Sequence, residues 1–221
     1  MPPPVTIGLL GGTGIEGKGI ALRFAKAGAS VTVGSRSLER ALAVARQLNQ
    51  QLGGELIGAA ENPEMIGRSE IIFLTVPFAQ AVDAINAYRH CFRQESILVD
   101  VTVPIKSKSS PGPGDLAEGS GSQFLAKRMP ESIPLVGAFK TIPAHVMAEL
   151  DLRLDCDVFV CSDSEAAKVR VIEAIRLIPD LRPVDVGGLD AAGTLERMTA
   201  LAIRINRRYK IKSARFRVVG L

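Results

Sequence analysis

Val5-Thr6-Ile7-Gly8-Leu9-Leu10-Gly11-Gly12-Thr13-Gly14-Ile15-Glu16-Gly17-Lys18-Gly19 carries the clearest structural signal in this chain. Its first six residues form a short apolar run that ends in glycines, which is typical of a buried strand. From residue 15 to residue 27 the apolar side chains recur at helical spacing, and Gly28 ends the pattern. The sequence therefore predicts a strand, a tight turn and a helix in immediate succession.

The turn between that strand and that helix contains the pattern G-x-G-x-x-G at Gly12, Gly14 and Gly17. In dinucleotide-binding folds the first glycine permits the turn, the second lets the backbone approach a pyrophosphate, and the third lets helix and strand pack closely. The helix N-terminus then offers unpaired amides to the phosphates. A glycine-rich turn without a ligand is the alternative. The predicted nucleotide loop comprises Gly12, Thr13, Gly14, Ile15, Glu16 and Gly17.

A nucleoside triphosphate loop of the Walker A type would need a serine or threonine after Gly17-Lys18, to hold a magnesium ion. Gly19 stands there instead, so hydrolysis of ATP or GTP is disfavoured.

Strands and helices are expected to alternate along the rest of the chain. Strands are predicted at residues 30–34, 55–59, 71–76, 97–101, 135–139, 158–160 and 183–186, and helices at 38–52, 78–88, 164–177 and 195–207. Parallel strands need such crossover connections, and continuous apolar runs indicate strands covered on both faces. This pattern predicts an α/β fold with a doubly wound, mainly parallel sheet of the Rossmann type.

The predicted domain organisation is a nucleotide-binding domain over residues 1–140, followed by a smaller C-terminal α/β lobe over residues 141–221. Residues 106–122 form a Pro- and Gly-rich loop by composition, which can be either a lid or a slack connection.

The composition is that of an ordinary globular protein: 221 residues, 47% hydrophobic and 23% charged. No apolar stretch reaches the length of a membrane span, and no signal peptide is recognisable, so we expect a cytoplasmic protein. Cys91, Cys156 and Cys161 are too few and too irregular for a disulfide framework, which fits a reducing compartment. With only His90 and His145 as further ligands, we expect no metal site.

The end of the second predicted strand distinguishes NAD from NADP, because an acidic residue there binds the ribose 2′-hydroxyl but repels a 2′-phosphate. This chain has Ser35-Arg36 at that point, and Arg40 follows one helical turn later. A hydroxyl and two guanidinium groups suit a phosphate dianion, so NADP is predicted. The alternative is that both arginines are solvated and that Ser35 or Ser37 caps a helix.

Thr75-Val76-Pro77 follows the fourth predicted strand, at the sheet edge where open α/β sheets bind ligands. We expect this turn to flank the nicotinamide, unless it is a purely structural proline turn. Acid–base groups are otherwise scarce: neither His90 nor His145 stands in a catalytic pattern, and no catalytic side chain is predicted.

Beyond these motifs, the chain resembles the NADP-dependent reductases of coenzyme F420, a deazaflavin. The segments that carry the resemblance are Leu9-Leu10-Gly11-Gly12-Thr13-Gly14, Gly17-Lys18-Gly19, Val33-Gly34-Ser35-Arg36, Thr75-Val76-Pro77, Thr141-Ile142-Pro143-Ala144, Leu181-Arg182-Pro183 with Asp185 and Gly187, Leu195-Glu196 and Asn206-Arg207-Arg208-Tyr209-Lys210. They span nearly the whole chain. The first is common to many Rossmann proteins, so the later ones make the likeness specific.

The resemblance implies a reversible hydride transfer between NADPH and the deazaflavin, with both reactive carbons supplied by the coenzymes. It implies that Thr13, Ser35, Arg36 and Arg40 hold the 2′-phosphate end and that Val76 and Pro77 abut the nicotinamide. It also implies that Ile142, Pro143 and Ala144 line the deazaflavin pocket, and that the protein is a homodimer. Two other hypotheses stay open. The protein could be a reductase of another acceptor, such as a flavin, a ferric chelate or an imine, or a non-catalytic sensor that binds NADP(H).

Members of that family often have histidine just before the Thr-Ile-Pro-Ala segment, whereas this chain has Lys140. Lys140 either pairs with the anionic tail of the deazaflavin or is a surface charge. The same choice applies to residues 203–221, which hold seven Arg or Lys and no acidic residue within a chain of net charge +4. This segment either attracts the anionic tail, or is solvated or faces a dimer partner. Without a recognition motif, nucleic-acid binding is not expected.

Overall fold

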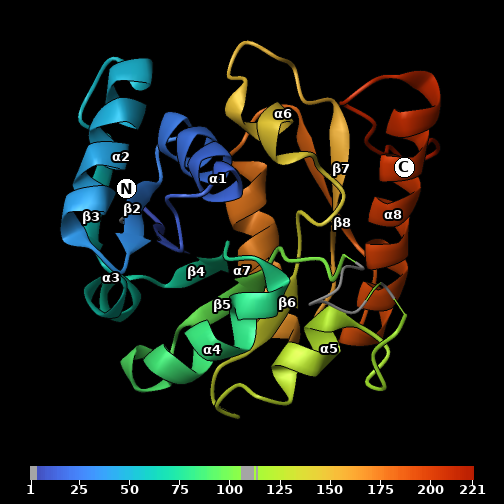
Figure 1. The fold of residues 1–221 in the computed structure, drawn as a ribbon, viewed down its shortest axis with the longest axis horizontal. Helices are drawn as coiled ribbons and strands as arrows, with labels where there is room; N and C mark the ends of the chain where they lie inside the picture. The colour runs from blue at the N-terminus through green and yellow to red at the C-terminus, as the bar shows by residue number, and fades with distance from the viewer. Residues whose placement is uncertain (1–3, 106–111, 113) are drawn as a thin grey trace.

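The computed structural model describes residues 4–105, 112 and 114–221, and it is centred on one twisted sheet (Figure 1). The six strands of this sheet are β1 (Thr6–Leu10), β2 (Ser30–Ser35), β3 (Ile57–Glu61), β4 (Ile71–Leu74), β5 (Ile97–Asp100) and β6 (Leu135–Gly137). They are ordered β3-β2-β1-β4-β5-β6, and every neighbouring pair is parallel. This is the strand order of dinucleotide-binding α/β folds, so the predicted fold class is confirmed.

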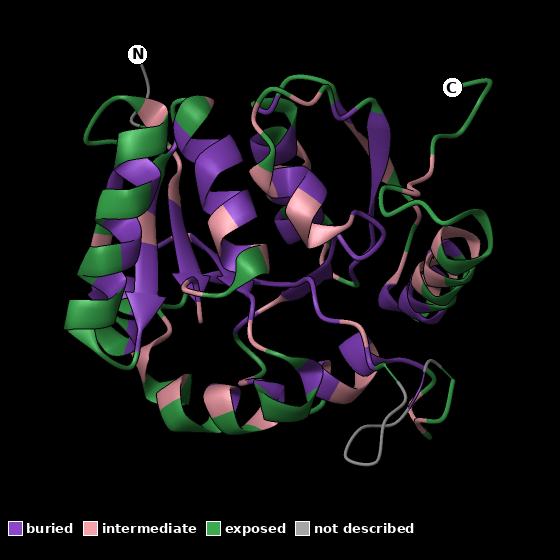
Figure 2. Ribbon diagram, turned by 45° about the horizontal axis from the view of Figure 1, so that its top comes forward, coloured by how far each residue is buried: buried purple, intermediate pink, exposed green. Residues whose placement is uncertain are grey.

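Helices cover both faces of the sheet. One face packs against α1 (Ile15–Lys26), α2 (Leu38–Leu52), α6 (Ala144–Ala148) and α7 (Glu165–Arg176). The other packs against α3 (Asn62–Arg68), α4 (Phe78–Tyr88), α5 (Gly121–Ala126) and the start of α8 (Ala192–Tyr209). Successive residues of a strand enter opposite layers: Ile71 and Phe73 face the first, and Ile72 and Leu74 the second. Burial on both sides explains why these strands are apolar runs (Figure 2).

The rest of the chain adds a second, two-stranded parallel sheet made of β7 (Cys156–Val160) and β8 (Leu181–Asp185), connected by α7. A single antiparallel bridge between Gly137 and Cys161 joins it to β6. Two 3-10 turns, Arg89–Cys91 and Leu189–Ala191, precede β5 and α8. The segment that follows α8 runs back to β7, where the Asp157 amide donates to the Phe216 carbonyl at 2.9 Å.

Local sequence sets the helix ends. The Ser37 hydroxyl accepts a hydrogen bond from the Arg40 amide at the start of α2, and Gly53 ends that helix in a left-handed conformation. The hydroxyls of Ser120 and Ser164 cap α5 and α7 in the same way. Ser37 is therefore the helix cap anticipated in the sequence, while the Ser35 hydroxyl only accepts from the Ser37 amide at 3.3 Å.

Several boundaries differ from the sequence-based expectation. The helices α3 and α6 were not expected, because seven and five residues are too short to establish a helical period. The third strand begins two residues later than predicted, at Ile57. The end of the predicted loop 106–122 is the first turn of α5. Residues 106–111 and 113 of that loop lie outside the described residues. The choice between a lid and a slack connection concerns these residues, so it lies outside the described part of the chain as well.

The hydrophobic core of the α1 face continues from β1 through α6 and β7 to α7, so it spans residues on both sides of position 140. Arg23 of α1 reinforces this continuity. Arg23 is a buried residue, and its guanidinium donates to the main-chain carbonyls of Val146, Met147, Glu149 and Leu152. The division into 1–140 and 141–221 stays a prediction. Across the described part of the chain, no helix combines the length and apolar character needed to traverse a lipid bilayer.

Candidate functional site: a nucleotide cavity at the carboxyl edge of the sheet

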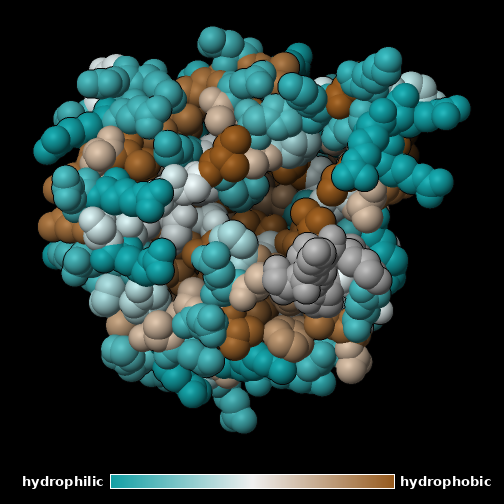
Figure 3. Space-filling view, viewed as in Figure 1, coloured by the Kyte–Doolittle hydropathy of each residue, from teal (hydrophilic) through white to brown (hydrophobic). Residues whose placement is uncertain are grey.

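A cavity of about 610 Å³ opens where β1, β2, β3 and β4 end. This volume is in the range of small-molecule and cofactor sites, and the location is where open α/β sheets bind ligands. The space-filling view shows hydrophilic side chains around much of the outline of the molecule and several apolar side chains towards the middle (Figure 3). The lining residues are Leu10, Gly11, Thr13, Gly14, Ser35, Arg36, Arg40, Asn62, Thr75, Val76, Pro77, Gln80, Asp83, Ala84, Ala87 and Tyr88.

The glycines of the loop are required for different reasons. A Cβ on Gly17 would lie 2.6 Å from the Cα of Gly12, so the turn and the helix could not pack as they do. A Cβ on Gly12 would lie 2.6 Å from that of Leu9. At Gly14, by contrast, such a Cβ would meet nothing closer than the Gly11 carbonyl at 3.8 Å, and its φ of −77° suits any residue. The space left open by Gly14 faces the cavity, which fits the close approach of a pyrophosphate.

We therefore expect Gly14→Ala to leave the fold intact and to weaken NADPH binding by at least about tenfold, because the added methyl group occupies ligand space. Isothermal titration with NADPH and urea unfolding measure the two effects. Gly17→Ala is the contrasting variant, and its main effect should be a lower free energy of unfolding, because its Cβ would collide with the backbone of Gly12. A Gly14→Ala protein that binds NADPH like the wild type would show that this space does not receive the nucleotide.

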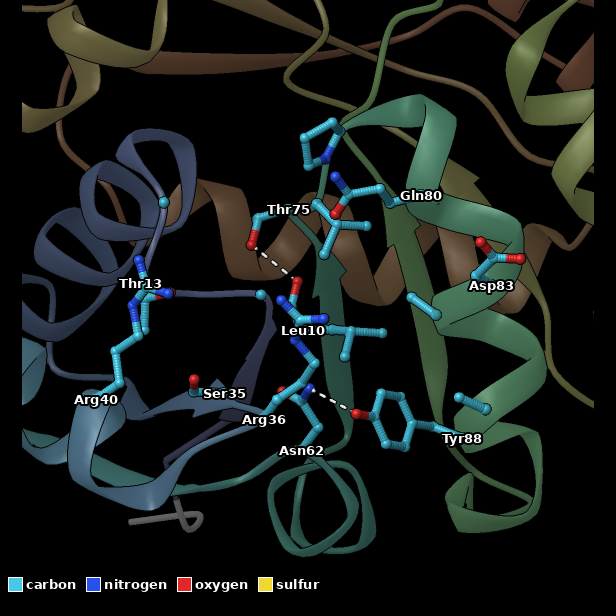
Figure 4. A pocket seen from close by; sticks show the side chains of 16 residues that line it. Leu10, Thr13, Ser35, Arg36, Arg40, Asn62, Thr75, Gln80, Asp83 and Tyr88 are labelled. Carbon is cyan, nitrogen blue, oxygen red and sulfur yellow. Dashed lines mark hydrogen bonds between the residues drawn. The ribbon is translucent and has the colours of Figure 1, made fainter. Parts of the chain in front are cut away.

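Arg36 and Arg40 stand at the β2 side of the cavity (Figure 4). Both are exposed, and no hydrogen bond or ion pair to another described residue engages either guanidinium. Ser35 is buried beside them, at the end of β2. Thr13 lines the same cavity, so all four residues predicted for the 2′-phosphate end are brought together. The two unpaired guanidinium groups among them suit a dianion.

The turn after β4 forms the opposite wall. Thr75 anchors it, since both its amide and its hydroxyl donate to the Leu10 carbonyl at 3.0 Å. Val76 lies so close to the glycine loop that a Cβ on Gly11 would be 2.4 Å from its Cγ1. Pro77 precedes the first residue of α4. All three residues predicted here line the cavity.

Sequence reasoning missed the side of the cavity formed by α3 and α4. Tyr88, Asp83 and Gln80 of α4 face Arg36 across the cavity, and the Asn62 amide nitrogen donates to the Tyr88 hydroxyl at 3.2 Å (Figure 4). Small residues at Ala84 and Ala87 leave room between these side chains. The spacing of these α4 residues by three or four positions was a usable signal. Asn62 was not detectable, because α3 was not expected.

The other predicted residues do not line this cavity. Gly12 is buried inside the loop, while Ile15, Glu16 and the buried Gly17 form the first turn of α1. Ile142, Pro143 and Ala144 lie where the chain enters α6, against the second turn of α1: a Cβ on Gly19 would be 3.1 Å from the Ala144 carbonyl. Ile142 is buried in the core, while Pro143 and Ala144 are half-buried. Their role in binding a deazaflavin stays a prediction.

Lys140 requires a correction. Its side chain is fully buried, and its ammonium donates to Asp100 Oδ2 at 2.8 Å and to the Thr102 carbonyl at 2.6 Å. It is therefore not a surface charge. Nor is it free to receive the anionic tail of a ligand, because its charge is already engaged inside the protein. This pairing was not predictable from the sequence, because Asp100 and Glu196, the two carboxylates near Lys140, lie far from it along the chain.

Comparison with known proteins identifies the family. A family model described as NADP oxidoreductase, coenzyme F420-dependent, matches residues 6–104. The F420-dependent NADP reductase of Methanothermobacter thermautotrophicus is 34% identical over 97% of this chain and 95% of its own length. That of Methanocaldococcus jannaschii is 30% identical over 97% and 98%.

This chain belongs to the F420-dependent NADP reductase family. A solved structure from Arthrobacter sp. FB24 aligns with 98% of this chain and all of its own, with a TM-score of 0.80 and 21% identity. Mycobacterium tuberculosis 3-hydroxyisobutyrate dehydrogenase covers 94% of the chain with a TM-score of 0.64 and 12% identity. At such identities these structures show the fold alone, and both support the Rossmann-type architecture.

In this member of the F420-dependent NADP reductase family, the first turn of α1 contains an unusual acidic group. Glu16 is half-buried, and its Oε1 atom is fully buried without a hydrogen-bond partner among the described residues. Burial raises the pKa of this carboxyl from 4.5 to about 8. The group is thus protonated at neutral pH, which removes a negative charge from the neighbourhood of the phosphate loop.

The raised pKa of Glu16 predicts a pH-dependent stability. Between about pH 4.5 and 8 the folded state retains a proton that the unfolded state has lost, so the free energy of unfolding falls as the pH rises. One such proton contributes at most about 1.4 kcal/mol per pH unit. In urea unfolding between about pH 5 and 8, Glu16→Gln should lose less stability than the wild type. Exposed Glu39→Gln is the control, and parallel curves for Glu16→Gln and the wild type would contradict the prediction.

The basic C-terminal segment of this family member is partly used within the protein. Arg215 donates to the Leu154 carbonyl at 2.6 Å, and Arg217 pairs with Asp155. Hydrophilic side chains project at the upper right of Figure 3, where Figure 1 places the C-terminus. These contacts tie the end of the chain to the segment before β7. Two of the seven positive charges are therefore already paired or hydrogen-bonded.

Proposed function

We propose that this protein transfers a hydride reversibly between NADPH and coenzyme F420. The observation that carries the proposal is the pair of guanidinium groups, Arg36 and Arg40, that face the nucleotide cavity without a protein partner among the described residues. The end of β2 has Ser35 and Arg36 in place of the acidic residue that would favour NAD. The similarity to F420-dependent NADP reductases over nearly the whole chain indicates that the acceptor is coenzyme F420.

The residues present fit a bound NADP. The gap at Gly14 would receive the pyrophosphate, Thr13, Ser35, Arg36 and Arg40 the 2′-phosphate end, and the turn at Val76 and Pro77 the nicotinamide. The two coenzymes supply the hydride donor and acceptor carbons themselves. The protein therefore has to bind, orient and exclude water, which explains why the sequence offers no catalytic acid, base or nucleophile.

We place the deazaflavin beside residues 141–144, so that the second site is built mainly from the part of the chain after residue 140. In support, this segment packs on α1 directly after the phosphate loop, and α1 is thus shared between the two sites. Ile142, Pro143 and Ala144 offer an apolar surface suited to a ring system.

Stopped-flow mixing of the purified protein with NADPH and oxidised coenzyme F420 tests the proposal. We expect loss of the deazaflavin absorbance with NADPH and much slower loss with NADH. Turnover only with a flavin, a ferric chelate or an imine would show that this compound, and not coenzyme F420, is the acceptor. Tight NADPH binding without turnover of any acceptor would instead assign the protein as a sensor of the nucleotide.

We also propose a homodimer in the cytoplasm that acts on small-molecule redox coenzymes, with neither nucleic acid nor a membrane as partner. Exposed apolar side chains along and after α8, namely Leu201, Tyr209 and Ile211, support a contact with a second copy. Light scattering coupled to size-exclusion chromatography should give twice the chain mass of 23.5 kDa. A single chain mass at micromolar concentration would refute the dimer.

A further inference from the structure

Three charged side chains meet inside the protein where β5 and β6 end. The side chains of Lys140, Asp100 and Glu196 are all completely buried. The Lys140 ammonium lies 2.8 Å from Asp100 Oδ2 and 3.8 Å from Glu196 Oε1, and it also donates to the Thr102 carbonyl at 2.6 Å. The cluster lies beside the segment to which the deazaflavin has been assigned, but none of its members lines the nucleotide cavity.

Asp100 connects the cluster to the loop after β5. Its Oδ1 accepts from the Thr102 amide at 2.9 Å and from the Thr102 hydroxyl at 2.6 Å. Its Oδ2 accepts from the Ser122 hydroxyl at 2.7 Å in addition to Lys140. One carboxylate therefore holds the end of β5, the residues just beyond it and the first turn of α5.

Glu196 connects the cluster to α8. It accepts from the amides of Gly121 and Ser122 at 3.0 and 3.3 Å, and burial raises the pKa of its carboxyl while Lys140 opposes that rise. One turn further along α8, the Thr199 hydroxyl donates to the Lys140 carbonyl at 2.7 Å. Both the side chain and the main chain of Lys140 are thus fixed from elements distant in sequence.

The backbone before Lys140 is strained. Phe139 has a φ of +57°, a left-handed conformation that costs free energy for a bulky residue and persists only where surrounding structure enforces it. Its ring packs against Phe24 and Phe73, with centroids 6.2 and 5.7 Å away. The Phe139 carbonyl then accepts from the Ile142 amide at 3.3 Å. Aromatic packing on one side and the Lys140 ion cluster on the other thus hold the turn that leads into residues 141–144.

Stability alone does not account for this arrangement. Three buried charges are costly to desolvate, and apolar residues of the same size often stabilise a core as well or better. A cation with several fixed partners does, however, specify one geometry. The segment that this geometry fixes begins at Thr141, directly after the lysine.

We propose that Lys140 is a positioning residue for the acceptor. By joining Asp100, Thr102 and Glu196, it sets where residues 141–144 lie relative to the ends of β4 and β5, and thereby how closely the acceptor ring approaches the nicotinamide. The identity of the acceptor rests on the proposed function, but the placement of residues 141–144 does not.

The test compares Lys140→Met with Lys168→Met. Lys168 is a matched control, because it too is a buried, ion-paired lysine, but its partners are Glu165 and Asp185 beside β8. Each variant is examined by amide hydrogen exchange over the whole chain, by titration with NADPH, and by the rate of coenzyme F420 reduction with both coenzymes saturating.

For Lys140→Met we expect exchange to accelerate at least about tenfold in residues 138–148 and 100–104, while the phosphate loop exchanges as in the wild type. NADPH affinity should change less than about twofold, and the saturated rate should fall by about 10- to 100-fold, the scale of a misplaced reacting group. Lys140→Arg, which keeps the cation, should recover part of the rate. Lys168→Met should leave all three measurements near wild-type values.

An unchanged saturated rate in Lys140→Met would overturn the proposal, as would faster exchange spread evenly over the chain. If Lys140→Met does not fold, Glu196→Gln is measured instead and should show the same local pattern at smaller amplitude; a wild-type pattern there would also overturn the proposal. If the wild-type protein fails to reduce coenzyme F420, the proposed function falls, and hydrogen exchange alone then decides whether Lys140 positions residues 141–144.

Discussion

Arg36→Ala should weaken NADPH binding by about 1.5 to 3 kcal/mol, roughly 10- to 150-fold in Kd, while the affinity for NADH changes little. Arg36 faces the nucleotide cavity with no partner of its own among the described residues, so its guanidinium is available for a charged hydrogen bond to a 2′-phosphate. NADH has no phosphate at that position and loses nothing. Removing Arg40 as well should erase most of the remaining preference for NADPH. Fluorescence titration of the wild type and both variants with each nucleotide gives the six affinities.

Arg46→Ala is the control for this experiment. Arg46 is an exposed arginine of the same helix, α2, but it does not line the cavity. It tests whether a general loss of positive charge is enough to weaken binding, in which case the effect would be small and strongly dependent on salt. Equal losses for NADPH and NADH in Arg36→Ala would remove Arg36 from the 2′-phosphate site and, with it, the main support for NADP.

Arg23→Met should lower the free energy of unfolding by about 3 to 5 kcal/mol. The Arg23 guanidinium donates to four carbonyl groups in and after α6, of which the Glu149 carbonyl also accepts from the Leu152 amide, and methionine donates to none. A buried carbonyl left without a donor costs about 1 to 3 kcal/mol. Water molecules that enter and bind some of these carbonyls would reduce the total cost. Burial also lowers the pKa of Arg23, with Asp180 and Asp151 opposing the shift. Urea unfolding at neutral pH measures the loss.

Lys26→Met supplies the comparison for Arg23→Met, since Lys26 is an exposed cation three residues further along α1. Its effect should stay within about 0.5 kcal/mol, as for most surface substitutions. A similarly small effect for Arg23→Met would mean that water replaces the guanidinium without cost and that α6 is held by apolar packing alone.

The nucleotide half of the fold was predictable because its signals are local. The apolar runs ending at Leu10 and Leu74, the glycine pattern from Gly12 to Gly17, and the polar residues after β2 are each contained in a few consecutive residues. Parallel topology then brings the carboxyl ends of those strands to one edge without further information. Eight of the predicted site residues accordingly line one cavity.

The remaining features depend on contacts between distant segments. Arg23 stands in no motif, and Lys140 was expected either at the anionic tail of the deazaflavin or at the surface. Only the fold shows that carbonyls in and after α6 surround Arg23 and that carboxylates from β5 and α8 surround Lys140. The Asn62–Tyr88 hydrogen bond likewise joins two elements 26 residues apart. Periodicity indicates which face of an element is buried, but it does not indicate the polar groups on the opposing surface.

The uninterrupted apolar layer from β1 to α7 has a consequence for how this protein responds to heat. Because this apolar layer is continuous, the chain should unfold in a single cooperative step on heating. A nucleotide bound at the phosphate loop should therefore raise the melting temperature of the whole chain. A thermal-shift measurement with NADPH alone would then detect destabilising mutations anywhere in the chain, including those around residues 141–144. Protection from proteolysis by bound nucleotide would extend as far as the C-terminal end of α7.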